Sequence, residues 1–317
     1  MKTILNILIV ILLAALLYVL IYPQYQENKV QQVKIACDSS IALVVYFVAQ
    51  DTGFFKNEKI EPTFVFYQNP NEGIEKIFKN ECDMGIFPWF VVFDYLKNKN
   101  ETLMVFTSYE FQSGITVDAI IVNQKKLKSK EKITFSLLNK KKFGVPFGYL
   151  PIAKEILERS GVDIKTVTFY EGSFGEIYEK FLKGELDAGL FIEPYRSLLI
   201  KEGYYVLLEG PLPKIYLPSY PGYAVGFSKN FFNKKRRLCA KIKRLTDGAI
   251  AIINKDAKYA REIYNKYFQF SAEGVRFPDI QKTGVMNKGA IISLFRKIYN
   301  EEPDTTILFV KPYQLQL

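Results

Sequence analysis

The sequence has no histidine among its 317 residues. This absence excludes a Ser-His-Asp or Cys-His nucleophile and any zinc site built on imidazole. Cysteine is scarce as well, because Cys37, Cys82 and Cys239 are too few and too far apart for a four-cysteine metal site. Their spacing pairs no two of them, so we expect buried free thiols. These absences exclude much enzyme chemistry before any motif is considered, and we expect neither a metal nor a cofactor.

The sequence also lacks low-complexity segments. Its composition of 49% hydrophobic and 24% charged residues is that of a globular protein, and its length predicts two lobes. The net charge is +10, with lysine-rich runs at 125–132, 139–142 and 234–244. In the last run Leu238 and Ile242 recur at helical spacing, which favours a solvated helix face near anionic lipid over a nucleic-acid site.

The amino terminus contains the one long hydrophobic run. It extends from Ile4 to Tyr22 with only Asn6 as a polar interruption, and as a helix it would be about 28 Å long at about 1.5 Å per residue. That length can span a bilayer, and the bulky residues before Pro23 offer no small-residue cleavage site. We interpret 1–22 as an uncleaved membrane anchor, with the remainder outside the cell membrane because Lys2 stays inside. A cleaved export signal and a buried helix are the alternatives.

Short apolar strands alternate with amphipathic helices from Val33 onward. In the segment 73–80, for example, Ile74, Ile77 and Phe78 lie on one face of a helix. Strands separated by helical crossovers indicate an α/β fold with a largely parallel sheet. The predicted strands are 33–37, 63–67, 84–87, 143–147, 167–170 and 188–192, and the predicted helices are 44–50, 73–80, 151–159 and 176–182.

The second half of this pattern repeats the first. Residues 75–87 and 179–191 are identical at seven of 13 positions, at an offset of 104. A helix–turn–strand unit used twice predicts two similar lobes, since a solenoid needs at least three copies. Two α/β lobes leave a cleft at the carboxyl ends of their strands, where such sheets bind ligands.

Several short motifs resemble those of one family. Residues 49–55 read AQDTGFF, similar to the A-x-x-x-G-F-F signature after a first strand, and the second half contains GVD at 161–163, GELDAG at 184–189 and EPY at 193–195. In this order they resemble the solute-binding proteins of ABC importers for nitrate, sulfonate, taurine and the thiamine pyrimidine precursor.

The resemblance covers about residues 33–210 and implies a fold and a division of the chain. The fold would be the two-lobed, type II periplasmic-binding-protein fold, which closes on a small molecule like a hinge. The first lobe would comprise about 33–120 and 221–317, and the second lobe 121–220. The chain would cross between the lobes near 121–124 and 217–220.

The candidate ligand-binding residues follow the predicted strands. In each strand–helix unit, the residues just beyond the strand face the cleft. This rule nominates Asp38, Ser39, Ser40, Gln68, Asn69, Trp89, Gly148, Tyr149, Glu171, Glu193 and Tyr195.

Trp89 and Glu193 are equivalent under the 104-residue offset, so we expect them to face each other across the cleft. An aromatic face opposite a carboxylate would suit a flat or cationic group. The alternatives are a core position for Trp89, a brace at the hinge for Glu193, and an N-cap role for Asp38.

The turn at 147–151 has two interpretations. Its backbone N–H groups could hold an anion at the start of a helix, or it could be a plain strand-to-helix turn. No arginine lies in the nominated loops, which disfavours a small inorganic anion such as nitrate. We therefore favour an organic ligand with a ring or an amine.

The resemblance implies a binding protein and not an enzyme. The protein would lie outside the cytoplasm, anchored or secreted, and deliver a small-molecule solute to an ABC permease and its ATPase. One alternative is the sensing ectodomain of a receptor. Another is an enzyme related to pyrimidine synthases, whose chemistry uses histidine and a cysteine cluster that this sequence does not contain.

Overall fold

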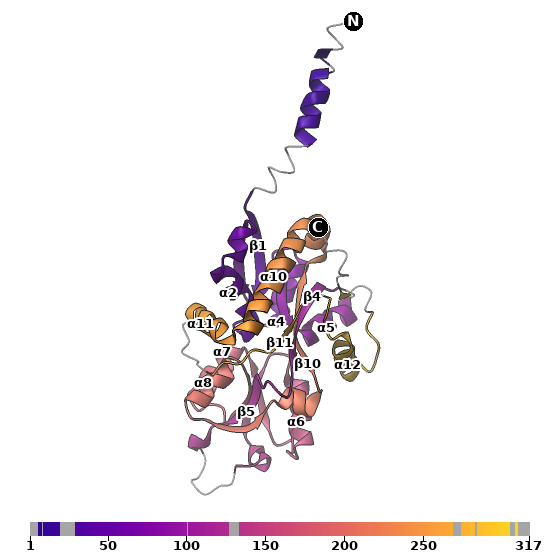
Figure 1. The fold of residues 1–317 in the computed structure, drawn as a ribbon. Coiled ribbons are helices and arrows are strands. Elements are labelled where there is room, and N and C mark those ends of the chain that lie inside the picture. The colour runs from indigo at the N-terminus through magenta and orange to yellow at the C-terminus, as the bar shows by residue number, and fades with distance from the viewer. Residues whose placement is uncertain are drawn as a thin grey trace.

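The computed structural model describes residues 6–7, 9–19, 29–99, 101–126, 133–268, 274–282, 284–304 and 308–309. These residues form two β-sheets, each covered by helices, which lie one above the other in Figure 1. We call each sheet with its helices a lobe. The arrangement is α/β, as the alternation of strands and helices predicts.

The first lobe contains a six-stranded sheet in which β1 pairs in parallel with both β2 and β3. Strand β10 lies between β3 and β4 and pairs antiparallel with both of them. Its strands in spatial order are β11 (Asp279–Gln281), β4 (Met104–Phe111), β10 (Tyr220–Phe227), β3 (Met84–Pro88), β1 (Gln31–Cys37) and β2 (Ile60–Phe66). Its helices are η1 (Ile41–Leu43), α2 (Val44–Asp51), α3 (Phe54–Asn57), α4 (Pro70–Phe78), α5 (Trp89–Lys99), α9 (Lys229–Lys234), α10 (Arg236–Lys255), α11 (Ala257–Phe268) and α12 (Lys288–Tyr299).

The second lobe contains a five-stranded sheet in which β6 pairs in parallel with β7 and β8, as β1 does with β2 and β3. Its strands in spatial order are β7 (Thr168–Gly172), β6 (Lys142–Pro146), β8 (Ala188–Ile192), β5 (Asp118–Val122) and β9 (Tyr205–Glu209). Its helices are η2 (Gln124–Lys126), η3 (Phe135–Leu138), α6 (Leu150–Arg159), α7 (Phe174–Leu182), α8 (Tyr195–Lys201) and the π-helix η4 (Leu212–Tyr216).

The repeat seen in the sequence is a repeat in the structure. Helices α4 and α7 and strands β3 and β8 correspond residue for residue at the offset of 104. Asn69 caps α4 and Ser173 caps α7, each accepting a hydrogen bond from a backbone N–H of the first turn. Gly85 and Gly189 also correspond, and in each a Cβ atom would collide with a phenylalanine ring two residues on, in Phe87 and Phe191.

The lobes are joined by crossing segments at one side. The first crossing lies between Phe111 and Asp118, several residues before the predicted position at 121–124, because β5 starts at Asp118 and pairs with β8 and β9. The second lies between β9 and β10, contains η4, and ends at the predicted position at 217–220. All of β5 therefore lies in the second lobe.

Two further sequence predictions concern buried side chains. Cys37, Cys82 and Cys239 are buried free thiols, as expected. In α10 the side chains of Leu238, Ile242 and Leu245 are buried, which leaves the basic residues on the outer face.

The amino-terminal helix is described only in part. Residues 9–19 are helical and exposed along their length, whereas the predicted anchor over 1–22 extends beyond the described residues at both ends. Within the described part of the chain, none of the helices combines the length and apolar character needed to cross a bilayer.

Candidate functional site

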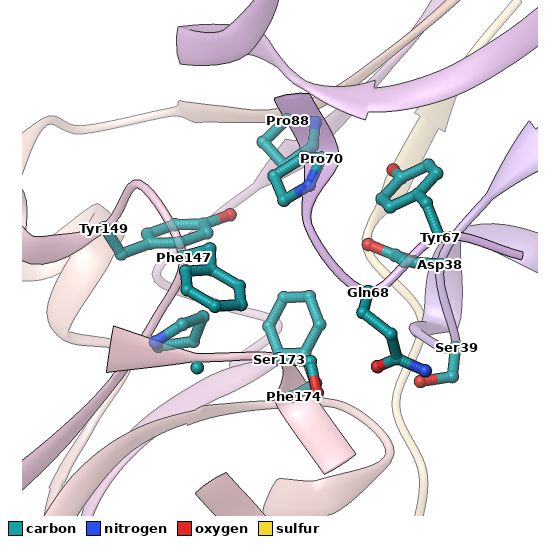
Figure 2. A pocket seen from close by; sticks show the side chains of 12 residues that line it. Asp38, Ser39, Tyr67, Gln68, Pro70, Pro88, Phe147, Tyr149, Ser173 and Phe174 are labelled. Carbon is teal, nitrogen blue, oxygen red and sulfur yellow. The ribbon is translucent and has the colours of Figure 1, made fainter. Parts of the chain in front are cut away.

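A pocket lies where the carboxyl ends of strands from both lobes meet. Figure 2 shows its first-lobe side with Asp38, Tyr67 and Gln68, and its second-lobe side with Phe147 and Tyr149. Its free volume is about 20 Å³, which is room for about one water molecule. The lining residues are Asp38, Ser39, Tyr67, Gln68, Pro70, Pro88, Pro146, Phe147, Tyr149, Gly172, Ser173 and Phe174.

Four of the predicted ligand-binding residues line this pocket. Asp38 and Ser39 follow β1, Gln68 follows β2, and Tyr149 precedes α6. The rule that residues just beyond parallel strands converge on one edge of each sheet thus brings together side chains far apart in the sequence.

Among the described residues that line the pocket, Asp38 is the one with a charge at neutral pH. Its side chain is 6% exposed, and its Oδ1 accepts a hydrogen bond of 2.9 Å from the backbone N–H of Ser40. Burial raises the pKa of Asp38 to about 6, and the hydrogen bonds from Ser40 oppose this shift. Among the described residues no lysine or arginine forms an ion pair with it.

Tyr67 and Tyr149 form apolar walls on opposite sides. Tyr67 stacks on Phe87 with the ring centroids 5.3 Å apart, and its hydroxyl donates to the carbonyl of Ile86. Tyr149 packs edge-on against Phe90 across the lobe boundary, at 4.8 Å. The Tyr149 hydroxyl is buried and has no hydrogen-bond partner among the described residues. Burial raises the pKa of both tyrosines well above the usual value.

Other pocket residues were missed in the sequence, and the repeat contains the signal that finds them. At the offset of 104, Gln68 corresponds to Gly172, Asn69 to Ser173 and Pro70 to Phe174. We nominated Glu171 in the second lobe instead, one residue before this set. Phe174 packs parallel to Tyr195, with the ring centroids 6.4 Å apart.

Trp89 does not lie in the pocket, which corrects its predicted placement across from Glu193. Its ring is 0% exposed and its Nε1 donates to Ser108 Oγ at 2.9 Å, within the first lobe. The ring also packs against Phe93 and Phe309. A large aromatic ring at the start of α5 is buried against β4 because that face of the helix covers the sheet.

Glu193 is also fully buried and lies outside the pocket lining, so its predicted position facing the pocket is corrected as well. Its carboxylate accepts hydrogen bonds from Arg196 Nη1 at 3.0 Å, Ser197 Oγ at 2.8 Å and the backbone N–H of Arg276 at 3.3 Å. Arg276 precedes β11 of the first lobe. Glu193 therefore holds a first-lobe segment against the second lobe, which is the bracing role that the sequence left open.

Glu193 belongs to a larger ion network at the lobe junction. Arg196 is 3% exposed and also pairs with Glu209 at 2.7 Å, and Arg276 donates to Thr116 Oγ1 at 2.6 Å and lies 3.6 Å from Glu209. Burial raises the pKa of Glu193 to about 7, although Arg196 favours its charged form. The nearby carboxyl group of Asp118 is fully buried, and its pKa is likewise raised to about 7.

The other nominated residues support the pocket without lining it. Ser40 Oγ caps η1 by accepting from Ala42 N, and Tyr195 Oη lies 2.9 Å from Ser39 Oγ across the lobe boundary. Gly148 has φ +81°, and a Cβ there would lie 2.1 Å from the Phe90 ring, so this tight turn requires glycine. Its N–H donates to Glu171 at 3.3 Å.

The described residues contain no group of three or more cysteine, aspartate or glutamate side chains placed to hold a metal ion. The site therefore offers a carboxylate, hydroxyls, an amide and aromatic faces. These groups can hold and orient a small molecule by hydrogen bonds, charge and ring contacts.

No protein-family model matches the chain, and no curated protein matches it. Several solved structures do match the chain. The alkanesulfonate-binding protein SsuA from Xanthomonas axonopodis pv. citri, bound to MOPS, is similar with a TM-score of 0.66 at 13% identity, covering 86% of this chain and 92% of that one. The fold is that of the periplasmic binding proteins.

Other structures with this periplasmic-binding-protein fold agree. The ligand-binding component of an ABC-type import system from Staphylococcus aureus, with zinc bound, has a TM-score of 0.71 at 13% identity and covers 90% of this chain and 98% of that one. The periplasmic nitrate-binding protein NrtA from Synechocystis PCC 6803 has a TM-score of 0.66 at 10% identity and covers 84% of this chain and 80% of that one. The neighbours thus include the sulfonate- and nitrate-binding proteins that the sequence motifs resemble.

Proposed function

We propose that this chain is the solute-binding protein of an ABC importer, which captures a small organic solute between its lobes and presents it to a permease driven by an ATPase. The observation that carries the proposal is the pocket, because both lobes contribute its walls. Its free volume of about 20 Å³ is too small for an organic solute. We therefore expect the lobes to separate so that a solute can enter and then to close around it.

The printed names of the structural neighbours support this role. They describe two sulfonate-binding proteins, a nitrate-binding protein and the ligand-binding component of an ABC-type import system with zinc bound. These are binding proteins, and we accordingly propose binding and not catalysis for this chain. Asp38, Ser39, Gln68 and Tyr149 are the proposed ligand-binding residues among those nominated from the sequence.

The test measures stability and lobe closure together on the full chain. A bound solute should raise the unfolding free energy by RT ln(1 + [L]/Kd), about 2.7 kcal/mol at 100 times Kd. Closure can be followed by labels at Lys79→Cys and Lys183→Cys, the equivalent C-cap residues of α4 and α7, whose side chains are 62% and 65% exposed. The three native cysteines are buried and should label poorly.

The panel should contain sulfonates, taurine, nitrate, aminopyrimidines and simple amines. At least one compound should raise the melting temperature and shorten the distance between the labels. If none changes either quantity, the proposed binding role is wrong. A compound that binds without changing the label distance would contradict the hinge mechanism alone.

We also propose that residues 1–22 anchor the protein with its lobes outside the cytoplasm. The apolar run without a small-residue cleavage site supports this proposal. The mature protein should retain its first residues and sediment with membranes. Soluble material whose amino-terminal sequence begins at about residues 24–30 would contradict it.

A further inference from the structure

The charge of the pocket differs from what an anion needs. Among the described residues that line it, Asp38 is the one that is charged at neutral pH, and neither lysine nor arginine is present. The two arginines at the lobe junction are occupied, since Arg196 pairs with both Glu193 and Glu209, and Arg276 lies beside Glu209. A bound anion would therefore meet a buried carboxylate without a compensating cation.

The backbone of the pocket also offers few donors to an anion. Helix starts bind anions through free N–H groups, but the lining residues Pro70, Pro88 and Pro146 have none. Asn69 and Ser173 accept hydrogen bonds from the first turns of α4 and α7. The N–H of Gly148, before α6, donates to Glu171. The chain's own groups thus occupy donors that an anion would use.

The same pocket has what a cation needs. Figure 2 shows the Asp38 carboxylate directed toward the middle of the pocket, with the rings of Tyr149 and Phe147 on the other side. Aromatic faces attract cations because their π-electrons are negative at the face. Phe174 adds a further ring from α7. A buried carboxylate facing aromatic rings is therefore complementary to a positive charge on an organic group.

We propose that the solute is a small organic cation, an amine or a protonated nitrogen ring, whose charge pairs with Asp38 while its carbon frame packs against Tyr149 and Phe174. The proposal rests on the proposed function, since it names the class of solute for the same pocket. It separates this chain from its structural neighbours, whose printed names include sulfonate and nitrate.

The experiment compares probes that differ only in charge. One series is 2-phenylethylamine, 2-phenylethanol and 2-phenylethanesulfonate, and a second is butylamine, butanol and butanesulfonate. Each is titrated against the full chain by calorimetry and by thermal unfolding at pH 7.5. The amines should bind at least tenfold more tightly than the matched alcohols and sulfonates, because a hydrogen bond to a charged partner is worth about 10- to 150-fold in affinity.

Two variants locate the charge. Asp38→Asn keeps an oxygen that can accept from Ser40 N but removes the charge, so it should weaken amine binding by about 10- to 150-fold. Asp118→Asn is the matched control, since Asp118 is also a buried carboxyl group but does not line the pocket. It should bind the amines within about threefold of the wild type. The fold of each variant is checked by circular dichroism and cooperative unfolding.

The outcomes separate the two proposals. Amine binding that Asp38→Asn removes and Asp118→Asn leaves intact supports the cation. Tighter binding of a sulfonate than of its matched amine, or amine binding that Asp38→Asn leaves unchanged, overturns the cation inference while the binding function stands. If neither these probes nor the wider panel of sulfonates, nitrate and aminopyrimidines binds, the proposed function is overturned, and the cation inference is overturned with it.

Discussion

The two copies of the repeated unit are alike up to the end of their last strand and differ beyond it. In both lobes the aspartate before that strand accepts a hydrogen bond from a backbone N–H of the neighbouring parallel strand. Lys34 N of β1 donates to Asp83 at 2.8 Å, and Lys142 N of β6 donates to Asp187 at 2.9 Å. The next equivalent pair is Trp89 and Glu193. Trp89 is buried inside one lobe and Glu193 joins the two, so a repeat predicts the unit but not the surroundings of the residue that follows it.

The largest effect should come from the tryptophan. Trp89→Ala removes a fully buried ring and its hydrogen bond to Ser108, and it should lower the unfolding free energy by about 3–5 kcal/mol. Urea denaturation measures this change. Phe66→Ala is the control, because Phe66 is 51% exposed and should cost far less. If the Trp89→Ala protein has normal stability but does not bind solute, the ring contacts the solute and its assignment to the core is wrong.

The effect of Glu193 should instead be seen in the pH dependence of the unfolding free energy. Burial raises the pKa of its carboxyl group from 4.5 to about 7 in the folded protein, so the group stabilises the fold below about pH 4.5 and this contribution is lost as the pH rises through about 7. Glu193→Gln removes the titration. The unfolding free energy of the variant relative to wild type should rise by about 3 kcal/mol between pH 4 and pH 8.

Glu179→Gln serves as the control for this pH series. Its side chain is 70% exposed and forms one surface ion pair, with Lys183 at 3.8 Å. Removing this exposed ion pair should have little effect on the unfolding free energy. If the Glu193→Gln and wild-type curves run parallel, the carboxyl group of Glu193 does not titrate in this range.

The hydrogen bond that both copies of the repeat share can be tested with a matched pair of variants. Asp83→Ala and Asp187→Ala each remove the acceptor of one strand N–H, and each should lower the unfolding free energy by about 1–2 kcal/mol. Because the sites lie in different lobes, the double variant should show the sum of the two effects. A clear loss in one lobe and none in the other would mean that the two hydrogen bonds are alike in geometry only.

The smallest effect should come from removing an ion pair that joins the two lobes. Lys297 on α12 of the first lobe donates to Glu155 on α6 of the second at 2.6 Å, at a half-buried site. Lys297→Met should favour lobe separation by less than about 1 kcal/mol, seen as a longer mean distance between the labels at positions 79 and 183. The control is Lys180→Met, which loses a pair with Glu185 inside the second lobe and should leave the distance unchanged.

Much of the fold follows from local patterns in the sequence. The predicted strand 188–192 is β8, and the predicted helix 151–159 is α6 with one residue added. These elements are bounded by recognisable signals, such as Pro151 in the first turn. The first crossing between the lobes lies earlier than predicted, because the apolar run 119–122 gives no sign of which sheet it joins.

The site residues that could be predicted are those that directly follow the carboxyl ends of parallel strands. Asp38, Ser39, Gln68 and Tyr149 follow from that rule, since the carboxyl ends of parallel strands converge. The ion network of Arg196, Glu209 and Arg276 did not follow from it. Arg276 lies far along the chain, and only tertiary packing brings its backbone N–H to Glu193.

The contacts between the lobes have a kinetic consequence under the proposed hinge mechanism. The Phe90 ring packs against Tyr149 and the Ser39 hydroxyl lies 2.9 Å from that of Tyr195, so both contacts should break when the lobes separate to admit a solute. The observed association rate should therefore rise with solute concentration and then level off at the rate of lobe opening. Lys297→Met should raise that plateau and shorten the residence time of the bound solute, which makes delivery faster at the expense of retention.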